Sequence, residues 1–148
     1  MGSQENRAQK MKPKFIKAFM KVAEVFAELS SAQRLKVGAI LVKDCRIISV
    51  GYNGTLPGED NVCEDENGNT KSSVIHAEEN LLMKLTKSSE NSIDSVMFVT
   101  HSPCINCAKL IANSGIKTVY YKNEYRSDEG IKLLRTRNID VFLLDFTS

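Results

Sequence analysis

SVMFVTHSPCINCAKLIANSGIKTVYY, residues 95–121, predicts a strand, a helix and a second strand in direct succession. Its ends, 95–100 and 117–121, are rich in β-branched and aromatic residues, as strands are. Its middle, 103–115, has the character of a helix that stops at Gly115. Two strands joined by such a crossover pair in parallel. The stretch therefore predicts one strand–helix–strand unit of a parallel sheet.

The segments on either side extend this unit into a larger α/β arrangement. They predict helices over 14–29, 74–87 and 128–138, and strands over 36–43, 46–53 and 140–146. The first two of these strands surround a short turn and are expected to form an antiparallel hairpin. The later strands alternate with helices and are expected to pair in parallel. The order predicts a three-layer α/β/α fold, with helices on both faces of one five-stranded mixed sheet.

Outside these elements the organisation is simple. We expect a mobile N-terminal arm over residues 1–13 and a single domain over residues 14–148, without internal repeats. The segment 54–73 is polar, rich in glycine and asparagine, and without periodicity. A loop of this length in a small domain usually covers or borders a functional site, so we expect a lid or rim here.

The composition excludes several classes of protein. The 148 residues carry 20 Lys and Arg against 18 Asp and Glu, and a net charge of +2 is too small for a protein that mainly holds nucleic-acid polymers. No stretch is long and apolar enough to cross a bilayer, and the N-terminus has no apolar signal segment. Four cysteines without such a signal favour a cytoplasmic protein, in which cysteine pairs more often bind metal or perform redox chemistry than form structural disulfides.

A zinc site is the main chemical prediction. Cys104 and Cys107 stand at i and i+3 at the start of the predicted helix 103–115, so both sulfur atoms can face one point. The helix N-terminus stabilises thiolates, the form that binds metal. Only two histidines are present, and His76 starts another long helix. If two adjacent parallel strands lead into these helices, His76 and the two cysteines meet at one sheet edge and bind Zn2+.

The fourth coordination position would then be left to water. An open position is typical of catalytic zinc, whereas four protein ligands close a structural site. Glu78 lies two residues after His76 and could reach that water. Packed core thiols and a redox dithiol are the alternatives for the cysteine pair. Cys45 and Cys63 could form a second, structural zinc site, but only His101 is left to join them, and His101 could instead lie beside a substrate.

The pattern H-A-E followed by P-C-x-x-C is that of zinc-dependent nucleobase deaminases. Over roughly residues 15–146 the chain resembles the deoxycytidylate (dCMP) deaminases, within the cytidine deaminase superfamily. The motifs that carry the resemblance are VGAILV (37–42), GYNG (51–54), HAEEN (76–80), THSPCINCAKLI (100–111), SGIKTVYY (114–121) and EYRSDEGIKLL (124–134). It implies a cytidine-deaminase-like fold and one catalytic Zn2+ bound by His76, Cys104 and Cys107. It also implies hydrolysis of dCMP to dUMP and ammonia, with Glu78 transferring the protons, to supply the precursor of thymidylate.

The resemblance implies further binding residues. Arg34 and Arg126 are expected to bind the phosphate, Asn53 to contact the sugar, and Tyr125 to flank the base. Related enzymes are activated by dCTP with Mg2+, inhibited by dTTP, and assembled as homo-oligomers that are often hexamers. The residues expected near the regulatory triphosphate are Gly51, Tyr52, Asn53, Gly54, Asn80, Lys84 and Lys87. The alternative for the arginines and lysines is a solvated surface position, and for Tyr125 it is simple packing.

Other functions share part of this pattern. The tRNA adenosine deaminases also have HAE and PCxxC, but they usually carry EPC where this chain has SPC, and they favour a more basic surface. Free cytidine deaminases usually have a cysteine at the position of His76. Deaminases of single-stranded polynucleotides stack bases on aromatic clusters, and this chain has no tryptophan. A non-catalytic, zinc-stabilised interaction module leaves Glu78 without a role. A phage protein acting in its host's cytoplasm fits the same expectations.

Overall fold

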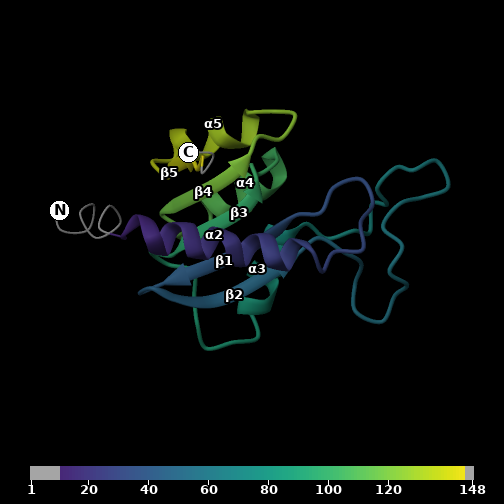
Figure 1. The fold of residues 1–148 in the computed structure, drawn as a ribbon, viewed down its shortest axis with the longest axis horizontal. Helices are drawn as coiled ribbons and strands as arrows, with labels where there is room; N and C mark the ends of the chain where they lie inside the picture. The colour runs from purple at the N-terminus through teal and green to yellow at the C-terminus, as the bar shows by residue number, and fades with distance from the viewer. Residues whose placement is uncertain (1–10, 146–148) are drawn as a thin grey trace.

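The structure, a computed structural model, describes residues 11–145, and Figure 1 shows the course of the chain. The expected arm, 1–13, lies outside the described residues except for its last three, of which Pro13 already begins a helix. The described elements are α2 (Pro13–Ala27), β1 (Gly38–Lys43), β2 (Arg46–Tyr52), α3 (Ala77–Leu85), β3 (Val96–His101), α4 (Ile105–Ala112), β4 (Thr118–Asn123), α5 (Glu129–Thr136) and β5 (Asp140–Leu143).

The strands form one five-stranded mixed sheet in the order β2-β1-β3-β4-β5. β1 is antiparallel to both of its neighbours, whereas β3, β4 and β5 are mutually parallel, which confirms the predicted hairpin and crossovers. The strands that lead toward α3 and α4 are β2 and β3. They run in the same direction, but β1 lies between them, so the expectation of two adjacent parallel strands is wrong. Both helices nevertheless start at the same end of the sheet.

Helices cover both faces of the sheet, which confirms the three-layer prediction (Figure 1). The amphipathic helix α2 covers one face, where its Met20 and Ala23 pack with Ile40, Phe98 and Tyr120. The helices α3, α4 and α5 cover the other face, and their apolar side chains form a larger cluster with inward-facing residues of β1, β3, β4 and β5. The burial of this apolar surface from both sides holds the ends of the strands in place.

Two glycines allow helices to lie directly against the sheet. A Cβ atom at Gly38 would lie 2.0 Å from the carbonyl oxygen of Ala23 in α2, and one at Gly51 would lie 2.4 Å from that of Ala77 in α3. Any larger side chain would force these helices outward. The space beside Gly51, a residue expected near the regulatory triphosphate, is therefore occupied by α3.

The long loop 54–73 projects from the end of the sheet at which β2 finishes (Figure 1). Its fold depends on side chains: the carboxylate of Asp65 accepts hydrogen bonds from the N–H groups of Asn67 and Asn69. The carboxylate of Glu64 accepts from the N–H groups of Gln33 and Arg34, which fastens the loop to the segment that precedes β1. Within residues 11–145, no helix combines the length and the apolar character that a membrane span requires.

Candidate active site

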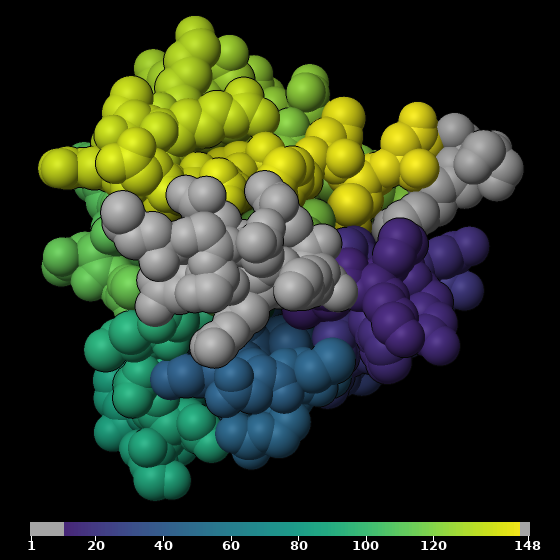
Figure 2. Space-filling view, turned by 90° about the vertical axis from the view of Figure 1, so that its left-hand side faces the viewer, coloured from purple at the N-terminus to yellow at the C-terminus, as the bar shows by residue number. Residues whose placement is uncertain are grey.

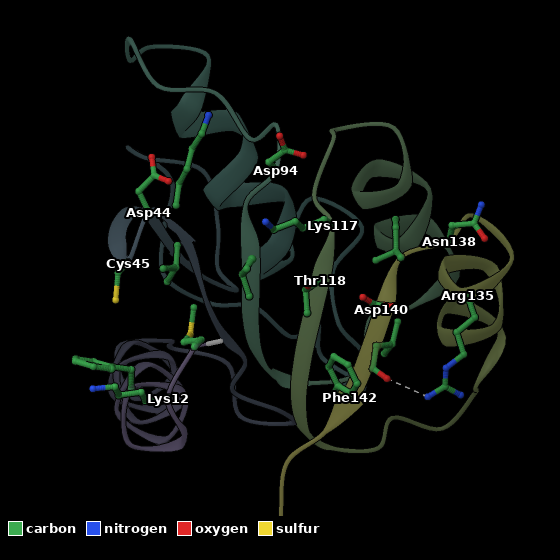
Figure 3. Close-up of a pocket in the computed structure, with 17 residues that line it drawn as sticks. Lys12, Asp44, Cys45, Asp94, Lys117, Thr118, Arg135, Asn138, Asp140 and Phe142 are labelled. Carbon is green, nitrogen blue, oxygen red and sulfur yellow. Dashed lines mark hydrogen bonds between the residues drawn. The ribbon is translucent and has the colours of Figure 1, made fainter. Parts of the chain in front are cut away.

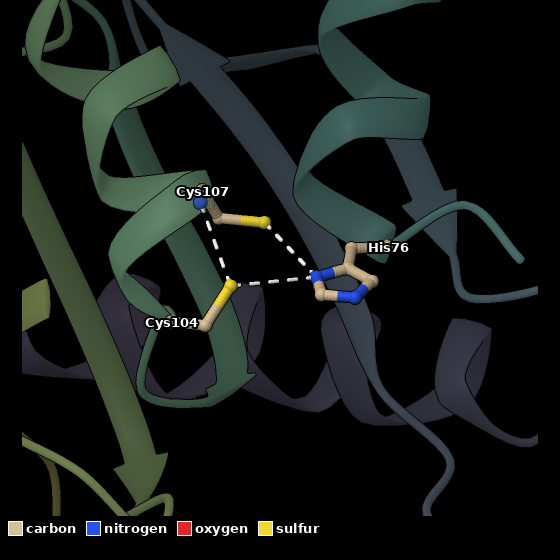
Figure 4. Close-up of side chains that lie close together, drawn as sticks. All are labelled: His76, Cys104 and Cys107. Carbon is tan, nitrogen blue, oxygen red and sulfur yellow. Dashed lines mark hydrogen bonds between the residues drawn. The ribbon is translucent and has the colours of Figure 1, made fainter. Parts of the chain in front are cut away.

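The three predicted metal ligands lie together at the starts of two helices (Figure 4). His76 is the residue immediately before α3, and Cys104 is the residue immediately before α4. The Nδ1 atom of His76 lies 3.2 Å from Sγ of Cys107 and 3.5 Å from Sγ of Cys104. Among the described residues, these three form the one group of metal-binding side chains whose ligand atoms all lie within 4.8 Å of one another.

These distances fit a zinc ion. Tetrahedral Zn2+, with bonds of about 2.3 Å to sulfur and about 2.05 Å to nitrogen, places a sulfur and a nitrogen ligand about 3.5 Å apart. The observed separations are 3.2 and 3.5 Å. Two thiols and an imidazole are also the donors that zinc prefers. His76, Cys104 and Cys107 can therefore hold zinc and leave its fourth position free.

Helix geometry and charge prepare these side chains for metal. The N–H group of Cys107 points at Sγ of Cys104, 3.5 Å away, and hydrogen bonds from Cys107 and His76 lower the pKa of Cys104 to about 3. The same thiolate raises the pKa of His76 to about 9 through their hydrogen bond. Hydrogen bonding to Cys104, together with burial, raises the pKa of Cys107. One negative charge on Cys104 is thus stable before any metal binds.

Glu78 projects from the first turn of α3 into the same site. Its side chain is only 4% exposed, and this burial raises its pKa to about 7, against the lowering effects of a backbone N–H group and of His76. A carboxyl group with a pKa near 7 can both accept and donate a proton at neutral pH. Glu78 therefore has the properties of a general acid and base beside the metal ligands.

A cavity of about 110 Å³ opens directly onto these groups. This is smaller than the roughly 300 Å³ at which ordinary ligand pockets begin, so it can enclose one ring but not a whole nucleotide. The 54–73 loop borders it through Thr70, which agrees with the expected rim. The residues that line it are Ala32, Leu35, Val37, Asn53, Thr70, Val74, His76, Ala77, Glu78, His101, Ser102, Cys104 and Tyr125.

Two of the four predicted substrate residues line this cavity, namely Asn53 and Tyr125. The amide of Asn53 is partly engaged, because its oxygen accepts from the N–H group of Val37 and its nitrogen donates to the carbonyl of Leu35. Arg34 and Arg126 are exposed and do not belong to the lining, although each is next to or near a residue that does. Their phosphate-binding role stays a prediction.

His101 and Ser102 also line the cavity. Nδ1 of His101 lies 3.0 Å from the hydroxyl of Thr100, and burial lowers the pKa of His101, so its ring is neutral at pH 7. From the sequence alone it stays open whether His101 and Ser102 help to select the nucleotide or only shape the entry to the helix that carries the cysteines. The apolar wall made by Leu35, Val37 and Val74 was not predicted from the sequence. Only their proximity to the recognised motifs could have indicated these positions.

The residues expected near a regulatory nucleotide cluster along β2 and α3. The side-chain amide of Asn80 donates to the carbonyl of Tyr52, and Nζ of Lys84 donates to that of Val50, so both side chains cover the outer edge of β2. Space beside Gly54 is open. The predicted helix 74–87 is shorter than expected, and Lys87 lies beyond its last residue, Leu85.

A larger cavity, about 1180 Å³, lies at the opposite end of the sheet (Figure 3). The turn of the β1–β2 hairpin, the start of α2 and β5 surround this end, which faces the viewer in Figure 2. Cys45 is exposed at the hairpin turn, whereas Cys63 is buried near Ser31, and neither joins a group of metal ligands within residues 11–145. The alternative of a second zinc site therefore receives no support.

Comparisons with known proteins agree with this geometry. A family model for the cytidine and deoxycytidylate deaminase zinc-binding region matches residues 13–123. The structure superposes on a dCMP deaminase of cyanophage S-TIM5, crystallised with dCMP and dUMP, with a TM-score of 0.89 and 48% identity, covering 90% of this chain and 99% of that one. A deoxycytidylate deaminase of Mycobacterium phage D29 is 34% identical over 76% of this chain and 98% of its own length.

A bacterial relative is longer than this chain. ComE operon protein 2 of Bacillus subtilis is 39% identical over 113 residues, which are 74% of this chain but only 59% of the bacterial protein. The residues that the family model matches include His76, Cys104 and Cys107.

Proposed function

The chain belongs to the cytidine and deoxycytidylate deaminase family, and we propose that it hydrolyses dCMP to dUMP and ammonia with the help of one zinc ion. The observation that carries the proposal is the meeting of three metal ligands with a buried carboxyl group at one small cavity. The 48% identity to a phage dCMP deaminase supports this substrate over the other substrates of the family.

The chain's own residues have distinct parts in this reaction. His76, Cys104 and Cys107 would hold the zinc ion, which would supply a Lewis acid that makes water easier to deprotonate near neutral pH. Glu78 takes one proton from the water that attacks C4 of the cytosine ring and gives it to the ring nitrogen. It then takes the second proton, from the hydroxyl now on C4, and gives it to the amino group, so that the C4–N bond breaks, ammonia leaves and C4 keeps a carbonyl oxygen. One water is consumed for each dCMP, and Glu78 ends in its original state.

The dimensions of the cavity support a pyrimidine nucleotide. The ring would enter the enclosed part beside Glu78, with Tyr125 at its wall. The sugar and phosphate would lie outside, where the second N–H of Asn53 and the guanidinium groups of Arg34 and Arg126 could reach them. Outside the cavity the phosphate stays hydrated, and hydrogen bonds from these guanidinium groups can replace part of its water contacts.

The test is an ammonia-release assay with dCMP, deoxycytidine, cytidine and a tRNA anticodon stem-loop. Release from dCMP above the other three substrates supports the proposal. Release from the stem-loop instead would identify a tRNA adenosine deaminase-like enzyme, and release from none, with zinc bound, would identify a non-catalytic zinc-stabilised module. The variant Glu78→Gln, which keeps all three ligands, should lose turnover by about 10²- to 10⁴-fold while retaining zinc.

We further propose that dCTP, with Mg2+, activates the enzyme, that dTTP inhibits it, and that it works as a homo-oligomer such as a hexamer. Support comes from the resemblance and from the grouping of Tyr52, Gly54, Asn80 and Lys84 at one edge of the fold. Assays of dCMP turnover with each triphosphate test the regulation. Light scattering of the protein as it elutes from a size-exclusion column tests the oligomeric state. The four free cysteines support the cytoplasmic location that we also propose.

A further inference from the structure

The segment after β4 carries the cavity residue Tyr125 but has few attachments. Residues 124–128 are exposed, and Tyr125 itself is 40% exposed although it lines the cavity. Regular pairing between β3 and β4 ends with His101 opposite Asn123. A side chain that is expected to flank a base must be held in place, and the sheet no longer does this at residue 125.

The hydroxyl of Ser102 supplies the missing attachment. Its Oγ accepts a hydrogen bond of 2.7 Å from the N–H group of Tyr125. The N–H group of Ser102 donates to the carbonyl of Asn123 at 2.9 Å, and the side chain of Asn123 donates to the carbonyl of Thr100, also at 2.9 Å. These bonds continue the pairing of the two strands beyond their regular ends.

Within residues 11–145, the segment has no second attachment of this kind. Among the described residues, the bond to Ser102 is the one hydrogen bond that joins residues 124–126 to another part of the chain. Ser102 itself is only 4% exposed and directly precedes Pro103 and the metal ligand Cys104. The position of Ser102 is therefore fixed by the packing of the metal site. The Ser102 side chain is short, with a single rotatable bond between its main chain and its oxygen, so the hydrogen bond to that oxygen also fixes the main chain at Tyr125.

We propose that Ser102 is a positioning residue that determines how well the site binds the pyrimidine nucleotide. Its hydroxyl holds the main chain at Tyr125, and thereby holds the Tyr125 ring at the wall of the cavity that opens onto His76 and Glu78. Ser102 acts through Tyr125 and takes no part in the proton transfers. The inference rests on the proposed function for the identity of the ligand, dCMP, but not for the attachment itself.

Removal of the hydroxyl should weaken substrate binding and leave the chemistry intact. Ser102→Ala is expected to raise KM for dCMP about 3- to 10-fold, the range for one ordinary hydrogen bond, with kcat within about 2-fold and zinc content unchanged. Ser102→Thr keeps an acceptor oxygen and should restore much of the loss. Hydrogen–deuterium exchange in peptides that contain residues 124–126 should accelerate in Ser102→Ala, and this measurement needs no substrate.

A double-mutant cycle with Tyr125→Ala separates positioning from general damage. If Ser102 acts through Tyr125, Ser102→Ala should change KM by less than about 2-fold in the Tyr125→Ala background. The matched control is Ser95→Ala, because Ser95 is fully buried just before the other end of β3 and donates to the carbonyl of Ser92 at 2.6 Å. That variant should lose stability without a change in KM or in exchange at residues 124–126.

Two results would overturn the inference. One is unchanged exchange at residues 124–126 in Ser102→Ala, and the other is a KM effect that multiplies with that of Tyr125→Ala. Failure of the proposed function looks different: wild-type protein would not release ammonia from dCMP, while exchange in Ser102→Ala still accelerated. In that case the cycle would be run with the substrate from the panel that is deaminated, or with zinc-loaded protein and dCMP binding as the readout.

Discussion

Replacement of Glu78 by glutamine should make the metal-free protein more stable while it removes activity. Glu78 is 4% exposed, and burial raises its pKa from an ordinary 4.5 to about 7. Between these two pH values the folded protein keeps the proton on Glu78, whereas the unfolded chain has released it. The favourable contribution of the protonated carboxyl is therefore complete below pH 4.5 and is lost as the pH rises through about 7.

The size of this loss follows from the same two pKa values. Linkage converts the difference between about 7 and 4.5 into roughly 3 kcal/mol of unfolding free energy at pH 8. Glutamine has nearly the same shape and never ionises. We therefore expect Glu78→Gln to match wild type at pH 4.5 to 5 and to exceed it by about 2 to 3 kcal/mol at pH 8.

Urea denaturation of both proteins, with a chelator and a thiol reductant at pH 5, 6, 7 and 8, measures this difference. Glu79→Gln is the matched control, because Glu79 accepts a 2.9 Å hydrogen bond from the N–H group of His76 at the start of α3. It should cost about 0.5 to 1 kcal/mol at every pH. A Glu78→Gln protein that is less stable than wild type at pH 8, or a gap that does not change with pH, would refute the reasoning.

The other predictions concern the metal, the helix packing and the phosphate. Chelation of zinc should abolish ammonia release. Re-addition of zinc should restore ammonia release in wild type but not in Cys104→Ser. Gly130→Ala should lower the free energy of unfolding by about 1 to 3 kcal/mol and weaken zinc binding in a metal-competition assay, because its Cβ would lie 2.2 Å from the carbonyl oxygen of Pro103. The control Gly54→Ala has open space around it and should change the free energy of unfolding by less than about 0.5 kcal/mol. Arg34→Ala should raise KM for dCMP about 10- to 100-fold more than KM for deoxycytidine, and equal losses for both substrates would remove Arg34 from the phosphate site.

The metal site could be predicted from the sequence because its geometry is largely local. Cys104 occupies the position before α4 and Cys107 lies within its first turn, so one helical turn fixes the relation between the two sulfur atoms. His76 stands at the equivalent position before α3. Only the meeting of the two helix starts needed the fold, and the prediction reached it by an incorrect route, since β1 separates the two strands.

Packing decided what the sequence could not. Gly51 looked like a residue that allows a ligand to approach, but a glycine in a strand serves equally well where a helix approaches, and the carbonyl of Ala77 occupies that space. Asn80 and Lys84 likewise looked available, yet both donate to carbonyl groups of the edge strand β2. A nucleotide that used either side chain would have to replace a hydrogen bond that already exists, which lowers the net gain.

The predicted substrate residues also have structural contacts that the sequence could not show. Asn53 was expected to contact the sugar, and the fold gives it a second task, since its amide holds the main chain at Leu35 and Val37. That bridge, together with the carboxylate of Glu64 on the N–H group of Arg34, fixes the backbone from which the Arg34 guanidinium extends into solvent. The backbone is thus prepared while the charged end is free to move. Phosphate selectivity should therefore depend on Asn53 and Glu64 as well as on Arg34. If the backbone at Arg34 were mobile, part of the binding free energy of each phosphate hydrogen bond would be spent on ordering it.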